Sequence, residues 1–230
     1  LSPSTIRSYE LIQKTKFPLI GHIRLNKLTN ELIQSEINQE AAHHAPKYIR
    51  NIYGLLTASL QMFAPEFRTH FSYPDYRKKE IVIPSADDIS RLLRLSAPFD
   101  QILAVKLAAF LGLRRGEICG IHVNDVNLSN GRLHVRRSVV LANDKTWIEK
   151  EPKTKAGRRE MVIPPFLEED LQKAISGKLP NDKLVHLTPN QISDNFETMV
   201  KQAGIPKCTF HALRHYFASV MLANNVPDKD

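Results

Sequence analysis

The sequence predicts a mainly α-helical protein with a small antiparallel β-sheet, in which a helical N-terminal domain precedes a mixed α+β C-terminal domain. In the first seventy or so residues, apolar side chains recur at helical spacing. Between residues 131 and 163, short apolar runs alternate with turn residues, which is typical of strands. Helices resume after Pro165. We therefore expect a helical domain over residues 1–72, a linker over 73–84 and a second domain over 85–230.

Three helices are expected in the N-terminal domain. Ile6, Tyr9 and Ile12 mark the first helix, and the second begins near Thr29, whose hydroxyl can cap a helix. The third follows the helix breaker Pro46, and its apolar stripe consists of Ile49, Ile52, Tyr53, Leu56, Leu60 and Phe63. Together these helices predict a small bundle.

The region after the third helix loses this periodicity. Residues 73–80, Tyr-Pro-Asp-Tyr-Arg-Lys-Lys-Glu, combine a turn with a basic run, which is typical of an interdomain linker. We place the boundary between the domains near Lys79.

The second domain is predicted to begin with two helices and then a sheet. Ser85 is expected to cap a helix over residues 87–95. Residues 100–111 are apolar on nearly every helical face, so this second helix is expected to be buried, and Gly112 ends it. The expected strands cover residues 131–135, 138–141, 146–149 and 161–163.

Helices are expected again beyond the strands. Thr188 and Gln191 have the spacing of a capping box, in which each residue's side chain bonds the backbone N–H of the other. The helix that they open runs to Gly204, which is suited to a helix C-terminus.

The composition limits the class of protein. The 230 residues carry 32 Lys and Arg against 24 Asp and Glu, a net charge of +8 that favours an anionic partner without proving one. Two cysteines are too few for a disulfide framework, and no apolar run has the length of a membrane span. A reduced, cytoplasmic protein is expected.

The positive charge of the second domain gathers in one segment. Between Lys145 and Arg159 there are six basic residues and two acidic ones. A cationic hairpin here can bind phosphates, because each Lys or Arg near DNA releases condensed counterions. A solvated surface hairpin is the alternative.

Two further segments carry residue types suited to a phosphodiester. Arg114 follows the helix end at Gly112, and its planar guanidinium can donate two parallel hydrogen bonds to one phosphate. The neighbouring Arg115 is expected to point elsewhere. Glu117, three residues after Arg114, is suited to holding a basic side chain, although a capping or surface role fits the spacing equally well.

The second segment contains His211, Arg214 and His215. His211 lies three residues before Arg214 and four before His215, so on a helix it would share a face with each of them. A histidine there can donate a hydrogen bond to a phosphoryl oxygen or move a proton near neutral pH. The His211 and His215 pair also has the spacing of a metal site, but no acidic residue is placed to complete one. We expect no metal and no cofactor.

Three segments together resemble the tyrosine recombinase family, also called phage-type integrases. Residues 111–118 and Asp125 are similar to the family's first arginine box, residues 152–159 to the stretch with its hairpin lysine, and residues 211–219 to its second box. The helices from Ser4 to Phe63 resemble the family's core-binding domain.

This resemblance implies a bacterial or phage-encoded, nucleoid-associated mobile-element integrase that performs site-specific recombination on double-stranded DNA and works as a homo-tetramer. Arg114 and Arg214 would clamp the scissile phosphate and stabilise its transition state. Lys153, with Lys155 as a substitute, would protonate the departing 5′ oxygen, His211 would assist, and Glu117 would support the site. The other expected DNA contacts are Lys47, Arg50, Lys150, Lys155, Arg158 and Arg159.

One departure from the family pattern concerns the nucleophile. The family's tyrosine follows a Leu-Gly-His segment after the second box, and the sequence stops at Asp230 before either. We therefore expect the chain as given to be inactive, and Tyr216 to pack in the core. A DNA-binding regulator without catalysis and a type IB topoisomerase-like enzyme are the alternatives.

Overall fold

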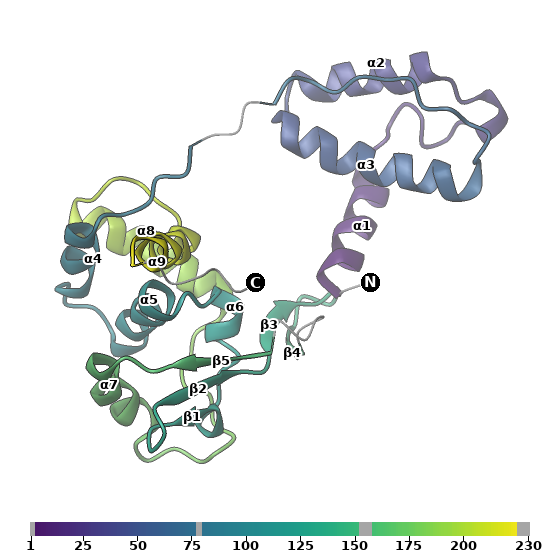
Figure 1. The fold of residues 1–230 in the computed structure, drawn as a ribbon. Coiled ribbons are helices and arrows are strands. Elements are labelled where there is room, and N and C mark those ends of the chain that lie inside the picture. The colour runs from purple at the N-terminus through teal and green to yellow at the C-terminus, as the bar shows by residue number, and fades with distance from the viewer. Residues whose placement is uncertain (1–2, 77–79, 152–157, 225–230) are drawn as a thin grey trace. The chain divides into compact units, whose positions relative to one another are not determined.

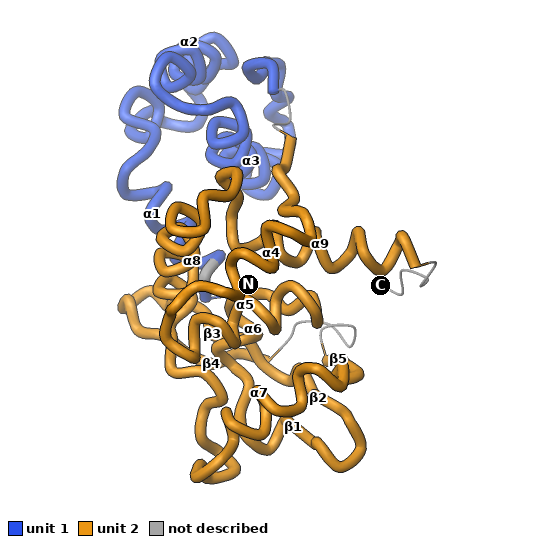
Figure 2. The backbone as a smooth tube through the Cα atoms, turned by 90° about the vertical axis from the view of Figure 1, so that its left-hand side faces the viewer, with its two compact units in different colours: residues 1–79 blue, residues 80–230 orange. Residues whose placement is uncertain are grey.

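The computed structural model describes residues 3–76, 80–151 and 158–224 (Figure 1). The chain divides into two compact units, residues 1–79 and residues 80–230, which are coloured separately in Figure 2. The mainly helical class with small antiparallel sheets is confirmed. None of the described helices is long and apolar enough to cross a membrane.

Unit 1 is built from helices alone in its described part. The predicted starts of its second and third helices are confirmed, because Thr29 accepts a hydrogen bond from the backbone N–H of Leu32 and Pro46 is the first residue of α3. Its core contains the buried side chains Ile33, Ile37, Ile49, Ile52 and Tyr53. The elements of this unit are α1 (Pro3–Thr15), the 3-10 helix η1 (Leu25–Lys27), α2 (Asn30–Ala41) and α3 (Pro46–Phe63).

The segment after α3 returns along α2 and belongs to the same unit (Figure 1). The backbone N–H of His70 donates to Asn30 Oδ1 at 2.7 Å, and that of Ser72 donates to Gln34 Oε1 at 2.8 Å. Tyr73, which the sequence placed in the linker, packs against the core of this unit. Side chains of α2 thus satisfy backbone groups of a segment that has no helical periodicity of its own.

Unit 2 surrounds α5 with helices. α5 is apolar on almost every face, and it packs against α4, α6, α8 and α9 (Figure 1). The expected capping boxes of Ser85 with Asp88 and of Thr188 with Gln191 are both present. The helices of this unit are α4 (Ala86–Leu93), α5 (Phe99–Leu111), α6 (Arg115–Ile118), the 3-10 helix η2 (Val123–Asp125), α7 (Pro165–Ile175), α8 (Pro189–Ala203) and α9 (Phe210–Ala223).

The described strands form two antiparallel sheets where the sequence predicted one. β2 pairs with β1 and β5, whereas β3 pairs only with β4. The inward residues of β2, Leu133 and Val135, are fully buried in the core, and β5 pairs along this strand with Arg159 opposite Val135. The strands are β1 (Val126–Asn127), β2 (Arg132–Val135), β3 (Ser138–Leu141), β4 (Trp147–Lys150) and β5 (Arg159–Val162).

This pairing corrects the prediction of a cationic hairpin between Lys145 and Arg159. β4 and β5 lie in different sheets, so the basic segment connects two sheets and its described strands do not pair with each other. Alternation predicts that a strand exists, but the partner strand depends on which core the inward side chains join.

Candidate active site

The two arginine segments meet at Gly112. This residue ends α5 in the left-handed conformation, with φ of 61°. Its carbonyl oxygen accepts a hydrogen bond from Nη1 of Arg214, 102 residues further along the chain. A Cβ atom at this position would lie 2.5 Å from Cδ1 of the Phe217 ring, so only glycine lets α9 approach this closely. The two segments therefore come together at the C-terminal end of α5.

Arg114 begins α6 at its N-cap position. Its side chain is 55% exposed, and Nη1 donates to Glu117 Oε1 at 2.9 Å. The adjacent Arg115 points to α8, where Nη1 donates to Ser193 Oγ at 2.6 Å. The two neighbouring guanidinium groups therefore face different parts of the unit, because consecutive residues point in different directions at a helix start.

Glu117 lies beneath Arg114 and is buried, with 6% of its surface exposed. Oε2 accepts the backbone N–H of Arg114 at 2.8 Å, and the guanidinium of Arg159 donates to both carboxylate oxygens, at 3.0 and 2.8 Å. Burial alone raises the pKa of the Glu117 carboxyl, but the bonds from Arg159 and Arg114 outweigh it and hold this pKa below its ordinary value. Glu117 is therefore a carboxylate at neutral pH.

His211 lies on α9, one helical turn before His215, and the two ring centroids are 4.8 Å apart. Desolvation, followed by the charges of His215, Arg214 and Arg114, lowers the pKa of His211 below its ordinary value. The imidazole is neutral at pH 7, so it can donate one hydrogen bond and accept another.

The other residues with expected roles are dispersed. Lys47 and Arg50 are exposed on α3, with the Arg50 guanidinium 5.4 Å from the centroid of the Tyr73 ring. Arg158 pairs with Glu151 at 2.5 Å. Lys150 ends β4, Tyr216 packs partly buried against the core of unit 2, and Lys153 and Lys155 lie outside the described residues.

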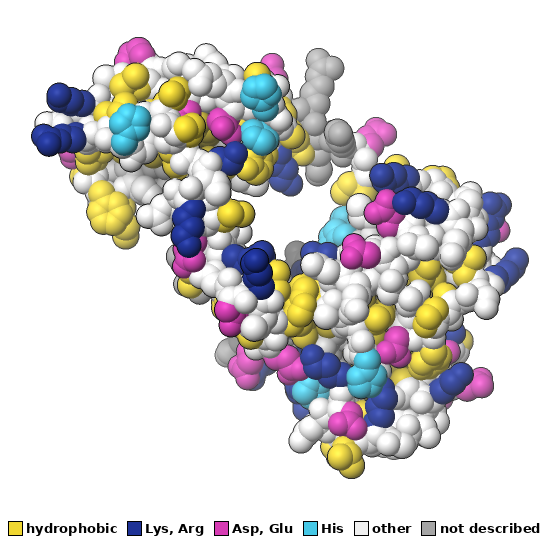
Figure 3. Space-filling view, turned by 180° about the vertical axis from the view of Figure 1, so that it is seen from behind, with side chains coloured by type: hydrophobic (Ala, Val, Ile, Leu, Met, Phe, Trp, Pro, Cys, Tyr) yellow, Lys and Arg dark blue, Asp and Glu magenta, His cyan; other side chains and the backbone are white. Residues whose placement is uncertain are grey.

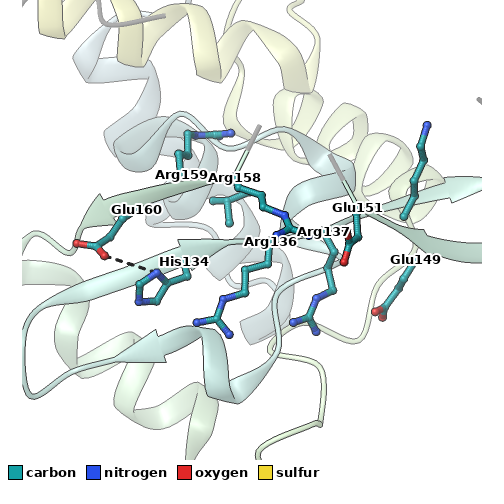
Figure 4. Close-up of a pocket in the computed structure, with 10 residues that line it drawn as sticks. His134, Arg136, Arg137, Glu149, Glu151, Arg158, Arg159 and Glu160 are labelled. Atoms are coloured by element: carbon teal, nitrogen blue, oxygen red, sulfur yellow. Dashed lines mark hydrogen bonds and ion pairs between the residues drawn. The ribbon is translucent and has the colours of Figure 1, made fainter. Parts of the chain in front are cut away.

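A groove of about 730 Å³ lies beside the strands of unit 2 (Figure 4). In Figure 4 the side chains of Arg136 and Arg137 extend to one side of the strands and Arg159 to the other, while Glu160 turns toward His134. The groove is therefore lined by both basic and acidic side chains. The lining residues are His134, Val135, Arg136, Arg137, Glu149, Lys150, Glu151, Arg158, Arg159 and Glu160.

The face of unit 2 seen in Figure 3 carries the same mixture of charge. On this face, Lys and Arg side chains are interspersed with Asp and Glu. This face presents no uniform basic surface, so the excess positive charge of the sequence does not by itself locate a DNA contact.

One buried cluster was not foreseen. Asp125 is fully buried, and its carboxylate accepts the backbone N–H of His122 at 2.9 Å and faces Arg136 and Arg137 at 3.5 and 3.4 Å. Arg137 Nη1 also donates to His122 Nδ1 at 2.5 Å, and the opposite ring nitrogen lies 3.0 Å from Glu149 Oε1. This network fixes the start of β3 to the segment after α6. Asp125 was named from the sequence only through the family's first arginine box, and the spacing of His122 and Asp125, three residues apart, is the signal that could have indicated their contact.

Metal ligands are not gathered in the described part of the chain. Within residues 3–76, 80–151 and 158–224, no three His, Cys, Asp or Glu side chains are placed to hold an ion together. The polar side chains at Gly112 and the start of α6 are the guanidinium groups of Arg214 and Arg114 with the carboxylate of Glu117, and two guanidinium groups are suited to an anion.

The fold and this site place the chain in the tyrosine recombinase class. Residues 85–230 match the Phage integrase family, and the chain belongs to that family. A prophage phiRv2 integrase of Mycobacterium tuberculosis is 31% identical over 150 residues, which cover 60% of this chain and 40% of that integrase. The chain thus matches less than half the length of this relative.

Two further relatives extend over almost the whole chain. A tyrosine recombinase XerC-like protein of Caldanaerobacter subterraneus is 23% identical over 280 residues, covering 99% of this chain and 69% of that protein. The Tn1549 transposon integrase, solved in complex with circular intermediate DNA, has a TM-score of 0.80 at 17% identity and covers 99% of this chain and 83% of its own. At that identity the structural likeness supports the fold.

Proposed function

We propose that this chain is part of a mobile-element integrase that recombines double-stranded DNA at specific sites by metal-free phosphoryl transfer. The observation that carries the proposal is the hydrogen bond from Arg214 to the Gly112 carbonyl, which brings the second arginine segment to the place where Arg114 and Glu117 begin α6. Two guanidinium groups and a neutral imidazole from distant segments suit a phosphate whose negative charge grows in the transition state.

In the proposed step, a tyrosine hydroxyl passes its proton to the acceptor nitrogen of the neutral His211 imidazole and attacks the phosphorus of the scissile phosphodiester. A 3′-phosphotyrosyl bond forms, the bond from phosphorus to the 5′ oxygen breaks, and that oxygen takes a proton from Lys153. Arg114 and Arg214 bind the non-bridging oxygens, because guanidinium groups stay protonated throughout. His211 donates a hydrogen bond to the same phosphate. Glu117 orients Arg114.

The proposed partner is a DNA duplex, contacted by both units. Lys47 and Arg50 of unit 1 and Lys150 and Arg158 of unit 2 are proposed to bind phosphates away from the cleavage point, where each contact adds affinity without chemistry. Four copies of the full-length protein are proposed to assemble on DNA, since site-specific exchange requires two duplexes with two cleavage sites each.

Covalent trapping tests this function. The full-length gene product is incubated with nicked duplexes made from the junctions that flank its gene, so that a strand released after cleavage cannot be rejoined. We expect a denaturation-resistant adduct of protein and DNA. Arg114→Ala and Arg214→Ala are each expected to lower the rate of adduct formation at least about 100-fold while leaving most DNA affinity.

Arg115→Ala is the matched control, because the neighbouring guanidinium binds Ser193 and not the site. It is expected to leave the cleavage rate of bound DNA within a few-fold of wild type. Binding of these junctions without any adduct would favour a DNA-binding regulator. Relaxation of supercoiled plasmids that lack the junctions would favour a topoisomerase.

A further inference from the structure

Arg159 occupies an unexpected place next to the candidate phosphate site. Its sequence position suggested a contact with DNA, yet its guanidinium makes two hydrogen bonds to the buried carboxylate of Glu117, 42 residues away. Its side chain is only 23% exposed. Because Nη1 and Nη2 of Arg159 both donate to this carboxylate, the guanidinium has few donors left for a phosphate.

The carboxylate of Glu117 is shared between two arginines. Oε1 accepts from Nη1 of Arg114 and Nη1 of Arg159, and Oε2 accepts from the backbone N–H of Arg114 and Nη2 of Arg159. All four bonds measure 2.8 to 3.0 Å. Arg159 therefore fixes the position of the Glu117 carboxylate. That carboxylate in turn holds both the backbone N–H and the guanidinium of Arg114 at the start of α6.

Charge gives Arg159 a second effect. A pair of Arg114 and Glu117 alone would be neutral and would attract an anion weakly, whereas the cluster with Arg159 carries a net charge of +1. Arg114 gives one Nη1 bond to Glu117, and its Nε and Nη2 atoms donate to none of the residues in 3–76, 80–151 and 158–224. These atoms remain available to a ligand.

The strand pairing makes this arrangement specific. Arg159 is the first residue of β5 and lies opposite Val135 of β2, which is buried. The preceding residue, Arg158, is 59% exposed and pairs with Glu151 at the surface. A shift of one residue in this register would exchange the two arginines.

From this geometry we propose that Arg159 is a positioning residue of the integrase site: it holds Glu117, and through Glu117 it orients Arg114 toward the scissile phosphate. This inference rests on the function proposed above. It replaces the direct phosphate contact that the sequence suggested for Arg159.

The two roles predict opposite results with the full-length protein and nicked junction duplexes. As a positioning residue, Arg159→Ala lowers the cleavage rate of fully bound DNA by about 10- to 100-fold, because a small displacement of Arg114 is sufficient. Its DNA affinity stays within about three-fold of wild type, and the dependence of affinity on salt is unchanged. A lost phosphate contact would instead weaken binding and reduce the salt slope by about one, with cleavage of bound DNA unaffected. That second pattern overturns the proposal.

Two further variants separate positioning from general stability. Arg132→Ala is the matched control, because Arg132 lies in the neighbouring strand β2 and pairs with Glu160 at the exposed surface. It is expected to spare the cleavage rate of bound DNA. Arg159→Lys keeps the charge but not the fork, so its rate should fall between those of wild type and Arg159→Ala. If Arg159→Ala does not fold, Arg159→Lys alone tests the proposal. Cleavage of bound DNA by Arg159→Lys at the wild-type rate would then count against it.

A coupling test identifies Glu117 as the intermediary. In a Glu117→Gln background, adding Arg159→Ala is expected to lower the cleavage rate by less than about three-fold. The reason is that both changes interrupt the same contacts, from Arg159 through Glu117 to Arg114. Independent, multiplying losses would overturn the route through Glu117. The absence of any adduct with the wild-type protein would refute the proposed function itself, whereas normal cleavage by Arg159→Ala refutes only this inference.

The pH profile gives a readout that a purely structural role would not change. The described charged groups that act on Glu117 are Arg114 and Arg159. Without Arg159, burial is opposed by Arg114 alone, so the pKa of Glu117 rises and the loss of cleavage at acidic pH moves to higher pH. An acidic limb at the wild-type position would contradict the proposal.

Discussion

Replacing Gly112 by alanine tests how the end of α5 joins the two halves of the site. A residue with a Cβ in the left-handed conformation costs about 1 to 2 kcal/mol. The new methyl would also lie 2.5 and 2.9 Å from two carbons of the Phe217 ring, closer than unbonded carbons approach. Forcing that ring aside costs about 1 to 3 kcal/mol more. The free energy of unfolding is therefore expected to fall by about 2 to 5 kcal/mol.

Gly204 provides the matched control for backbone strain. It ends α8 with φ of 63°, and apart from its own chain neighbours no atom of the described residues lies within 4 Å of its added Cβ. Gly204→Ala is expected to cost only the strain, about 1 to 2 kcal/mol. The difference in the loss of unfolding free energy between Gly112→Ala and Gly204→Ala therefore measures the cost of the contact with Phe217 of α9.

Urea unfolding followed by the fluorescence of Trp147 measures both variants, because the chain's one tryptophan lies in β4 of unit 2. In a Phe217→Ala background the ring is absent, so Gly112→Ala should then cost no more than Gly204→Ala. Equal losses for Gly112→Ala and Gly204→Ala in the wild-type background would refute the close approach of α9. A larger loss for Gly112→Ala than for Gly204→Ala in the Phe217→Ala background would refute it too.

Three other changes are expected to have measurable effects on stability. Ser85→Ala removes the capping box of α4 and should lower the urea midpoint by the equivalent of about 1 kcal/mol; an unchanged midpoint would show that the cap contributes nothing. Asp125→Asn removes a buried charge that faces Arg137 and should lower the free energy of unfolding by about 1 to 3 kcal/mol. Asp87→Asn, at an exposed ion pair, should lower it by less than about 1 kcal/mol. Similar losses for the two variants would contradict this account. Burial raises the pKa of Glu36 against opposing backbone hydrogen bonds, so its stabilising contribution is present below pH 4.5 and is lost as pH rises through the raised pKa. Glu36→Gln should therefore gain stability relative to wild type between pH 4 and pH 7 in thermal unfolding, and a pH-independent difference would contradict the shift.

Local signals in the sequence were sufficient for most helices. Thr29, Ser85 and Thr188 cap helices where their side chains predicted, and Gly112 and Gly204 end helices in the left-handed conformation. These features depend on neighbours three or four residues away, so they can be interpreted without knowledge of the rest of the chain.

The sequence by itself determined the family, the helices and the residue types of the candidate site, because arginine and histidine boxes combine chemistry with short-range spacing. Only the tertiary structure decided that the strands form two sheets and that Arg159 binds Glu117. Alternation specifies which side of a strand is buried but not which strand it joins. A guanidinium can pair with any carboxylate it reaches, so the partner of Arg159 depends on the register of β5 along β2. The position of Arg214 depends instead on the close packing of α9 against Gly112.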